Sequence, residues 1–177
     1  MNNLIKEEKT ELEGWGVKLT RLTEDKIELV RTWRNKPEVQ QYMEYRNYIT
    51  SEMQKQWFPK INNDENFYFI LSKDGKDIGL MNIKDIDYTK GEGESGSLIW
   101  DMSFRNMHIG TKSKILLTDF AFDYLKLNTL RATILENNVR SIRLNLKFGY
   151  IQVAEGKYLL LKENYYKNRT DILNNLE

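Results

Sequence analysis

The sequence predicts a mixed α/β domain, and three observations carry this prediction. Residues 66–72 ("NFYFILS") and 77–86 ("DIGLMNIKDI") are rich in aromatic and β-branched side chains, and the Asp74-Gly75 turn between them predicts a β-hairpin. Further along, residues 97–135 read strand, helix, strand, which predicts a right-handed unit with two parallel strands. No internal repeat or low-complexity linker divides the chain, so we expect a single domain.

The first part of the chain predicts one strand and three helical segments. A strand at 17–22 is followed by a helix with Thr23 as its N-cap, and the apolar residues of this helix fall on one side. A short helical piece and a helix at about 50–57 come next, before Pro59 and a polar loop. Residues 1–16 are polar and charged, and we expect an N-terminal extension there, followed by a domain at 17–177.

The second part predicts two helices that enclose a strand. The helix at 111–127 carries apolar residues around most of its circumference, so it should be packed on more than one side. After a strand at 130–135, Asn138 caps a helix that ends near Gly149, where a left-handed residue is favoured. Residues 150–168 predict two or more further strands.

Composition excludes several classes of function. The 27 basic and 26 acidic residues nearly cancel, which argues against general electrostatic binding of nucleic acid or of an anionic membrane. With no cysteine and one histidine, the chain lacks disulfides, a cysteine nucleophile, the usual Ser-His-Asp triad and most zinc sites, so we expect no metal. No apolar run is long enough to span a bilayer, and the N-terminus lacks the core of a signal peptide; a cytoplasmic protein is the default expectation.

The loop before the helix at 111–127 is a candidate anion site. The turn that enters the helix of a strand-helix-strand unit exposes backbone N–H groups beside the positive end of the helix dipole, and glycine allows close approach of a diphosphate. The segment "RNMHIGT" (105–111) has this placement. One glycine before a helix is more often an ordinary turn, so the loop alone identifies nothing.

A second motif lies in "ENNVRSIRLNLKFGY" (136–150), at the distance from the loop that one family requires. This segment resembles the fourth helix of the GNAT acetyltransferase superfamily, and the resemblance covers about 17–165. It implies a central mixed, mostly antiparallel sheet of about six to seven strands, with helices on both faces and one parallel, splayed strand pair. It also implies acetyl-CoA as co-substrate. The matching residues are Asn138, Ser141, Lys147, Gly149 and Tyr150.

The resemblance also implies which residues bind acetyl-CoA, and it shows two departures. His108 stands where the family's diphosphate loop has its first glycine, and Asn145 stands where many relatives have a general-acid tyrosine. His108 is therefore expected to contact phosphate or to be structural. The expected cofactor-binding residues are Met102, Ser103, Arg105, His108, Ile109, Gly110, Thr111, Asn138, Ser141 and Lys147.

Enzymes of this family transfer the acetyl group directly from the thioester to an amine through an oxyanion, which agrees with the absence of cysteine. The resemblance implies a backbone N–H donor to the oxyanion near residues 100–103. Glu94 and Asp101 are the best candidates for the base, with solvated surface charges as the alternative. Ser141 is a candidate proton donor to the leaving thiolate, or simply a polar residue of a first helical turn.

The upstream half favours one branch of the family. "RTWRNKPEVQQYM" followed by "ITSEMQKQWF" resembles GNAT enzymes that acetylate amino groups on nucleotide-linked sugars. We therefore expect a small-molecule amine as acceptor, bound by Arg34, Asn35, Tyr45 and Arg46, with Trp33 and Trp57 in the core. A ribosomal-protein-type N-terminal acetyltransferase and a non-catalytic acyl-CoA-binding module remain alternatives, and a homodimer remains open.

Overall fold

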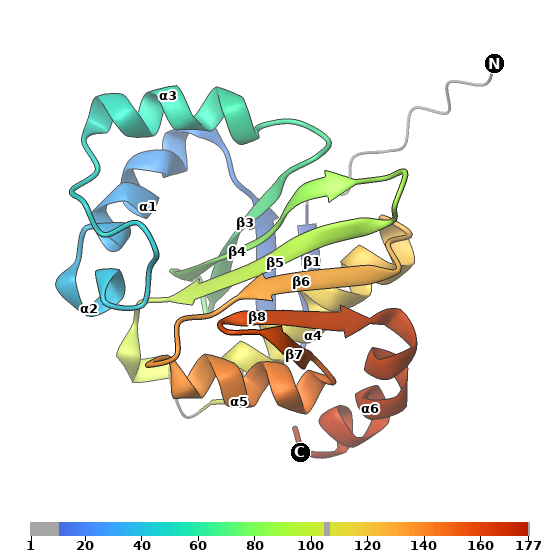
Figure 1. Ribbon diagram of the computed structural model, residues 1–177. Coiled ribbons are helices and arrows are strands. Elements are labelled where there is room, and N and C mark those ends of the chain that lie inside the picture. Colours follow the sequence, from blue (N-terminus) through green and yellow to red (C-terminus); the bar gives the residue numbers. More distant parts are fainter. Residues whose placement is uncertain (1–10, 105–106, 177) are drawn as a thin grey trace.

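A single mixed sheet organises the computed structural model, which describes residues 11–104 and 107–176 (Figure 1). Eight strands of the described chain lie in the order β1-β2-β3-β4-β5-β6-β8-β7, and among their pairings only β5 with β6 is parallel. The mostly antiparallel mixed sheet is thereby confirmed. The strands are β1 (Glu11–Gly14), β2 (Val17–Arg21), β3 (Phe67–Lys73), β4 (Lys76–Asp87), β5 (Glu92–Ile99), β6 (Thr129–Thr133), β7 (Ile151–Ala154) and β8 (Lys157–Leu161).

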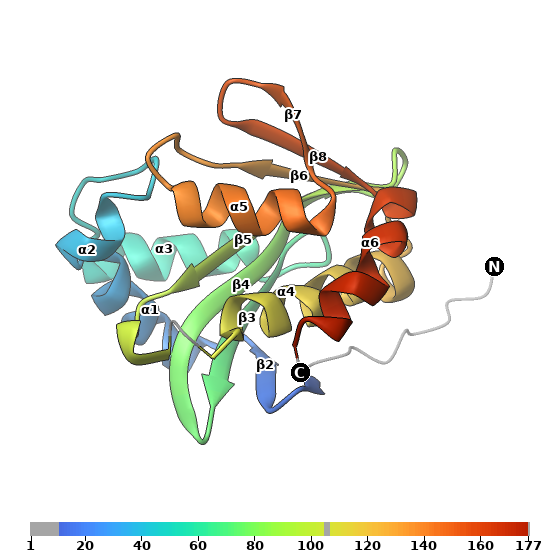
Figure 2. The same cartoon turned by 90° about the horizontal axis from the view of Figure 1, so that it is seen from below.

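Helices cover both faces of this sheet (Figure 1, Figure 2). One face carries α1 (Ile27–Arg34), α2 (Pro37–Gln40) and α3 (Ser51–Ile61), with a 3-10 turn η1 (Glu24–Lys26) before α1. The other carries α4 (Ile109–Asp119), which continues into a π-helical turn η3 (Phe120–Tyr124), and then α5 (Val139–Phe148) and α6 (Lys162–Asn174). A second 3-10 turn, η2 (Met102–Phe104), follows β5.

The apolar run of β3 explains why both faces need helices. Phe67, Phe69 and Leu71 belong to a core that includes residues of α4, α5 and α6, whereas Tyr68 and Ile70 pack with residues of α1 and α3. Successive side chains of a strand point to opposite faces, so an uninterrupted apolar run must be covered on both sides.

The parallel strand pair opens after a short ladder. Residues 92–94 of β5 pair with 129–131 of β6, and the ladder ends there, although β5 continues alongside β4 to Ile99. The expected splayed pair is therefore present, and its gap begins at Ser95. Because that gap lies in the middle of the sheet, it exposes backbone groups that a continuous ladder would occupy.

An ion pair fastens α6 to the end of α4. Asp119 accepts hydrogen bonds from Arg169 Nε at 3.0 Å and Nη2 at 2.7 Å, and from the Tyr165 hydroxyl at 2.7 Å. The two charged side chains are 29% and 23% exposed, so solvent screens them only partly. Bidentate geometry and partial burial make this pair a genuine contributor to stability.

We expect Asp119→Ala to lower the free energy of unfolding by about 2 kcal/mol, because it leaves a half-buried guanidinium without its carboxylate. Asp123→Ala is the matched control, since Asp123 of η3 accepts one exposed hydrogen bond from Tyr166 of α6. That change should cost less than about 0.5 kcal/mol. Urea unfolding of both variants measures the difference, and equal losses would refute the special weight of Asp119.

Several element boundaries differ from the expected ones. Strand β5 begins at Glu92, ahead of the expected start at residue 97. Residues 11–14 form β1, whose Leu12 is buried, so the sheet starts before the expected domain boundary at 17. Helix α3 runs through Pro59 to Ile61. Residues 162–174 form α6, where a strand was expected around Asn164. In the part of the chain that the structure describes, no helix has the length and apolar character needed to cross a membrane.

Candidate active site

The gap between β5 and β6 directs specific backbone groups inward. Trp100 N–H donates to Ile78 O of β4 at 3.3 Å, and the antiparallel register places these two residues opposite each other. In such a ladder, N–H groups point toward the partner strand at every second residue. The N–H groups of Ser97 and Ile99 therefore point toward the gap, beyond the last paired residue of β6.

Near residues 100–103, where an oxyanion donor is expected, two backbone N–H groups already have partners within the chain. The N–H of Trp100 bonds to β4, and that of Ser103 donates to the Asp101 carboxylate at 3.0 Å. Residues 102–104 form the 3-10 turn η2 and not a strand. The N–H groups that face the gap are therefore those of Ser97 and Ile99, because the register, which the sequence does not display, decides the direction of each N–H.

Two pockets meet at this gap. The first, a cavity of about 310 Å³, extends under α1 and α3 along β4 and β5, and we call it the inner pocket. The second, of about 340 Å³, lies between the end of β5 and the start of α5, and we call it the outer pocket. Their shared wall consists of Tyr42, Met43, Ser97, Leu98, Asn138 and Ser141. Two molecules, one in each pocket, would therefore touch at Ser97 and Ser141.

The outer pocket is bordered by the first turns of two helices. Gly110 stands in the first turn of α4, and a Cβ added there would meet Leu144 at an ordinary 3.5 Å. Asn138 begins α5 and accepts a hydrogen bond from Ser141 N–H at 3.2 Å. The N-terminal N–H groups of a helix and its dipole favour a bound anion. Two such ends beside one pocket suit a diphosphate with an attached chain.

The backbone conformation of His108 accounts for the glycine that the family pattern has at this position. This residue is exposed, precedes α4 and adopts a left-handed backbone with φ of 54°. This conformation costs an ordinary residue energy and costs glycine little. The departure from the expected loop pattern is therefore a matter of backbone strain and not of a side chain that blocks the pocket.

The inner pocket combines an arginine with aromatic rings. Arg34 lies in its wall with Tyr45, Trp57 and Tyr68, and burial lowers the pKa of its guanidinium. Among the described residues, no hydrogen bond or ion pair holds this guanidinium. Trp57 packs against the α1 and α3 core as expected, but it also lines the pocket, with its ring edge-on to Tyr68.

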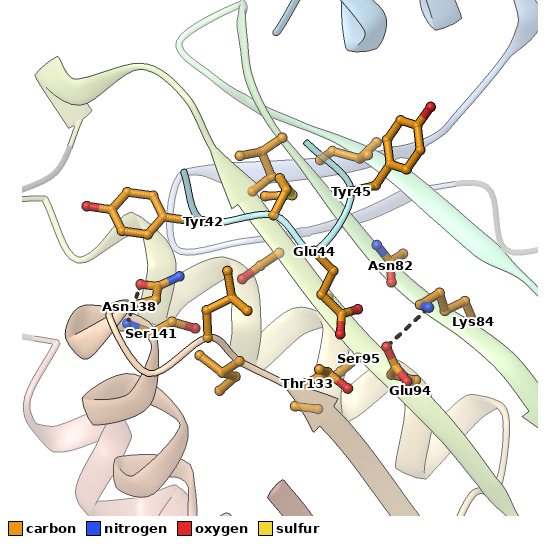
Figure 3. A pocket seen from close by; sticks show the side chains of 18 of the residues that line it. Tyr42, Glu44, Tyr45, Asn82, Lys84, Glu94, Ser95, Thr133, Asn138 and Ser141 are labelled. Carbon is orange, nitrogen blue, oxygen red and sulfur yellow. Dashed lines mark hydrogen bonds and ion pairs between the residues drawn. The ribbon is translucent and has the colours of Figure 1, made fainter. Parts of the chain in front are cut away.

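A carboxylate lies on the opposite wall of the inner pocket. Figure 3 shows Glu94 and Lys84 at one end of the pocket and Asn138 and Ser141 at the other. Lys84 Nζ lies 3.1 Å from Glu94 Oε1. Burial disfavours the charged ammonium of Lys84, but the carboxylates of Glu94 and Asp85 outweigh it and raise its pKa. The side chain of Glu94 is 25% exposed, so the ion pair is open to the pocket.

The deepest wall of the inner pocket holds a polar cluster that sequence reasoning missed. Lys114 of α4 is 5% exposed and Asn145 of α5 is also 5% exposed. Beside them, Ser95 Oγ and Tyr150 Oη share a buried hydrogen bond of 2.7 Å. The signal available in the sequence was a lysine at position 114, on a helix that is apolar around most of its circumference and also carries Lys112 and Lys126.

The structure does not bring every predicted site residue to the pockets. Asp101 lies outside both pockets. It accepts a hydrogen bond from the Ser103 hydroxyl at 2.6 Å, and this bond, with one from the Ser103 N–H, lowers its pKa. Arg46 is exposed and donates to Met43 O at 3.1 Å. Arg105 lies outside the described residues, and of Met102 only the backbone is described. Ile109 and Thr111 are buried in α4, and Lys147 is exposed at the end of α5.

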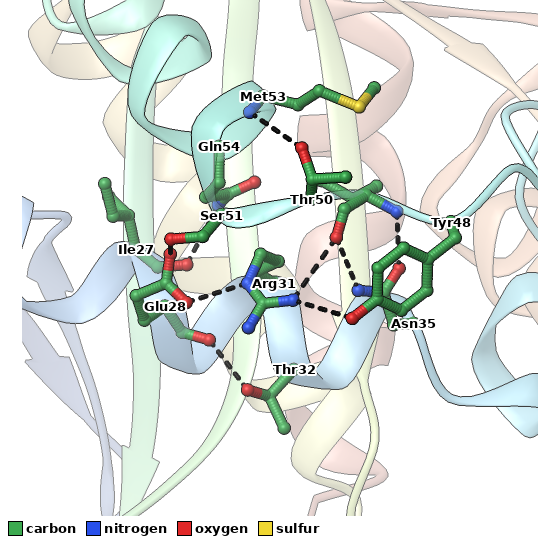
Figure 4. Close-up of polar contacts among 11 residues, drawn as sticks. Ile27, Glu28, Arg31, Thr32, Asn35, Tyr48, Thr50, Ser51, Met53 and Gln54 are labelled. Carbon is green, nitrogen blue, oxygen red and sulfur yellow. Dashed lines mark hydrogen bonds and ion pairs between the residues drawn. The ribbon is translucent and has the colours of Figure 1, made fainter.

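Asn35 has a structural role instead of a place in the cleft (Figure 4). Its amide nitrogen donates to Ile49 O and its amide oxygen accepts from Ile49 N, both at 2.8 Å. Arg31 adds a bond to the same carbonyl at 3.3 Å and pairs with Glu28 at 2.7 Å. These bonds hold α1 against the segment that leads into α3. Residues 42–45 of this segment line one wall of the inner pocket.

Known proteins share this architecture. The chain is 29% identical to Acetyltransferase PseH of Campylobacter jejuni over 129 residues. The alignment covers 71% of this chain and 76% of that protein. A GCN5-related N-acetyltransferase from Brucella melitensis superposes with a TM-score of 0.74 at 19% identity, covering 96% of this chain and 86% of that one. Spermidine N-acetyltransferase from Vibrio cholerae, solved with CoA and spermine, gives 0.71 at 15% identity, covering 86% and 99%.

The family profile described as "Acetyltransferase (GNAT) domain" matches residues 17–151. This range includes the splayed strands, both pockets' shared wall and the helix that Asn138 begins. The chain belongs to the GNAT acetyltransferase family.

Proposed function

We propose that this N-acetyltransferase transfers the acetyl group of acetyl-CoA to a primary amine of a nucleotide-linked amino sugar. The observation that carries the acceptor proposal is Arg34, a guanidinium in the pocket wall with which no carboxylate of the described residues forms an ion pair. Phosphate oxygens are the natural partners of such a group, and Tyr45, Trp57 and Tyr68 beside it offer ring faces for a base or a sugar.

The outer pocket fits the donor. The backbone N–H groups at the start of α4 and α5, with Gly110 and Asn138, would hold the diphosphate, and Ser141 would lie near the thioester at the shared wall. Acetyl-CoA supplies an activated acetyl group when bound. The N–H of Ser97, which faces the gap, would then donate to the carbonyl oxygen as negative charge develops there.

Arg34→Met should raise the KM for a nucleotide-linked amino sugar about tenfold to 100-fold, because a charge-assisted hydrogen bond to phosphate is lost. Arg46→Met is the matched control, since Arg46 points its charge outside the inner pocket. Steady-state kinetics with equal thermal stability of both variants measures the effect. A larger loss in Arg46→Met than in Arg34→Met would contradict the proposed acceptor site.

Glu94 is the better placed of the two predicted bases, since it lines the inner pocket and Asp101 does not. We expect Glu94→Gln to lower kcat about 100-fold, because the acceptor ammonium then has no carboxylate to take its proton. Lys84→Met is the control: it removes the cation of the pair but keeps the carboxylate, so kcat should fall far less than in Glu94→Gln. An unchanged kcat in Glu94→Gln would assign Glu94 to the ion pair alone.

Thiol release from acetyl-CoA, measured against a panel of acceptors, tests the function as a whole. The panel contains nucleotide-linked amino sugars, free amino sugars, polyamines and peptides with free N-termini. The proposal expects the highest kcat/KM with a nucleotide-linked sugar. Release only with peptides would favour an N-terminal acetyltransferase, and tight CoA binding without release would favour a non-catalytic module.

A further inference from the structure

We propose that Lys114 is the proton carrier of this enzyme, giving a proton to the departing thiolate and taking up the one that the acceptor amine loses. The proposal deepens the acetyl transfer proposed above and does not depend on which amine is the acceptor. The proposal starts from the lack of a proton donor at the position where many relatives have a general-acid tyrosine. Four residues after Ser141 this chain has Asn145, whose amide is no acid.

The side-chain amide of Asn145 forms its hydrogen bonds within α5. Its amide nitrogen donates to Ser141 O at 2.8 Å and approaches Ser141 Oγ at 3.4 Å. Its amide oxygen is buried, and within the described residues it has no hydrogen-bond partner. A buried acceptor without a partner, on the wall of a pocket, is suited to a donor that arrives or moves during the reaction.

Lys114 of α4 is a cationic donor that lines the same pocket as Asn145. It lines the inner pocket together with Ser141 and Asn145, yet only 5% of it is exposed. Its Nζ lies 4.7 Å from the centre of the Tyr150 ring and 5.5 Å from that of Phe148. No ion pair to Lys114 is present in the described parts of the chain. Ring faces stabilise an ammonium without neutralising it, so the proton stays available.

A buried ammonium without a carboxylate is costly to maintain. Burial lowers the pKa of Lys114 to about 7, so both protonation states are populated near neutrality. A group with that property can give a proton and regain it within one turnover. The other ionisable groups that line the same pocket are Arg34, Tyr42, Glu44, Tyr45, Tyr68, Lys84 and Glu94.

Rival donors fit less well. The Tyr150 hydroxyl, beside Lys114, is bonded to Ser95, and burial raises its pKa. Tyr42 lines both pockets, but it turns its hydroxyl away from Ser95 and Glu94 (Figure 3). Glu94 is paired with Lys84 and is proposed to act on the amine. Compared with Tyr150, Tyr42 and Glu94, only Lys114 is a cationic acid, and it lines the same pocket as Ser141 and Asn145 without a carboxylate partner among the described residues.

The proton balance closes. The acceptor nitrogen forms a bond to the acetyl carbon, and the bond from that carbon to sulfur breaks with its electron pair on sulfur. The Lys114 ammonium gives one proton to the sulfur and becomes neutral. An acceptor that arrives as an ammonium first gives one proton to Glu94, which releases it to solvent. The second proton, which the nitrogen loses once its bond to the acetyl carbon has formed, recharges Lys114 through the pocket. No oxidant, reductant or further reactant is needed.

The absence of cysteine from the chain allows a selective test. Lys114→Cys should lower kcat about 100-fold while the KM for the acceptor changes less than about threefold. Alkylation of the unfolded variant with 2-bromoethylamine, followed by refolding, produces a side chain that differs from lysine only by a sulfur atom in place of one methylene group. This treatment should restore kcat. Alkylation with iodoacetamide rebuilds a neutral chain and should not. Lys60→Cys, exposed on α3, is treated in the same way as the control.

Two readouts do not depend on turnover. CoA affinity, measured by calorimetry, should be the same in the wild type and in Lys114→Cys. Equal affinity would show that the substitution leaves the CoA-binding site intact. In the free protein, a lysine carbon resonance that is missing from the variant's NMR spectrum should titrate near pH 7 and not near 10.

Several outcomes would overturn the proposal. A raised KM with an unchanged kcat would make Lys114 a holder of an anion on the acceptor. Full activity in the carbamidomethylated variant would make it structural, and a titration near pH 10 would remove its acidity. A wild type that releases thiol with some amine other than a nucleotide-linked sugar would refute only the proposed acceptor, and the Lys114 test then proceeds with that amine.

Discussion

Lys114→Met is expected to raise the free energy of unfolding at pH 7, on the order of 3–5 kcal/mol. Methionine keeps the length and most of the volume of lysine without a charge to desolvate. A pKa lowered from 10.5 to about 7 corresponds to a penalty of this size, at about 1.36 kcal/mol per pKa unit. Urea unfolding at pH 7 measures the gain. A destabilised variant would show that the ammonium is held by favourable contacts and not merely tolerated.

The same comparison has a predicted dependence on pH. Between pH 7 and about 10 the unfolded wild type keeps its Lys114 proton while the folded protein has lost it, so unfolding binds a proton and wild-type stability rises with pH. Below pH 7 both states are protonated and the penalty is complete. The advantage of Lys114→Met should therefore be largest at pH 7 and below, and should shrink toward pH 10. An advantage that does not change with pH would assign it to packing.

Ser97→Pro is expected to lower kcat about 100- to 1000-fold, the loss that accompanies removal of one oxyanion donor. Proline removes the N–H that faces the gap, whereas the ladder to β4 uses the N–H groups of the neighbouring residues. The sheet should therefore survive, as proline is tolerated where a strand N–H is not paired.

Ser97→Ala is the control, because it removes the exposed hydroxyl and keeps the backbone donor. We expect it to retain most of the wild-type kcat, and both variants to unfold cooperatively in thermal melts. Equal loss of kcat in the two variants would assign the effect to the hydroxyl. An active Ser97→Pro variant would move the donor to the N–H of Ile99, the other one that faces the gap.

The elements that the sequence predicted well are those with a strong local signal. The hairpin of β3 and β4, the helix α4, and the helix between Asn138 and Gly149 all formed, with Gly149 at φ of 96°. Helix α6 was mistaken for a strand because it buries only Tyr165 and Ile172 and carries two adjacent tyrosines, which favour strands. A contact that holds this helix in place, the ion pair of Asp119 with Arg169, spans 50 residues and is not visible in the local sequence.

The candidate site was predicted in part, for a similar reason. Arg34, Tyr45, Glu94, Gly110, Asn138 and Ser141 all line a pocket. Residue identity could not separate Arg34 from Arg46, or Glu94 from Asp101, since only tertiary structure decides which side chain faces inward. Lys114 was missed because a lysine on an apolar helix has no motif; its burial depends on the strands that part in front of it.

The shared wall of the two pockets has a consequence for kinetics. In the proposed complex, donor and acceptor would approach Ser97 and Ser141 from separate cavities, so neither would have to leave before the other could enter. The proposed chemistry then runs through a ternary complex, and initial-rate lines at different donor concentrations intersect instead of running parallel. An inhibitor that joins a pantetheine-like arm to an amino sugar would occupy both cavities at once and gain from the linkage.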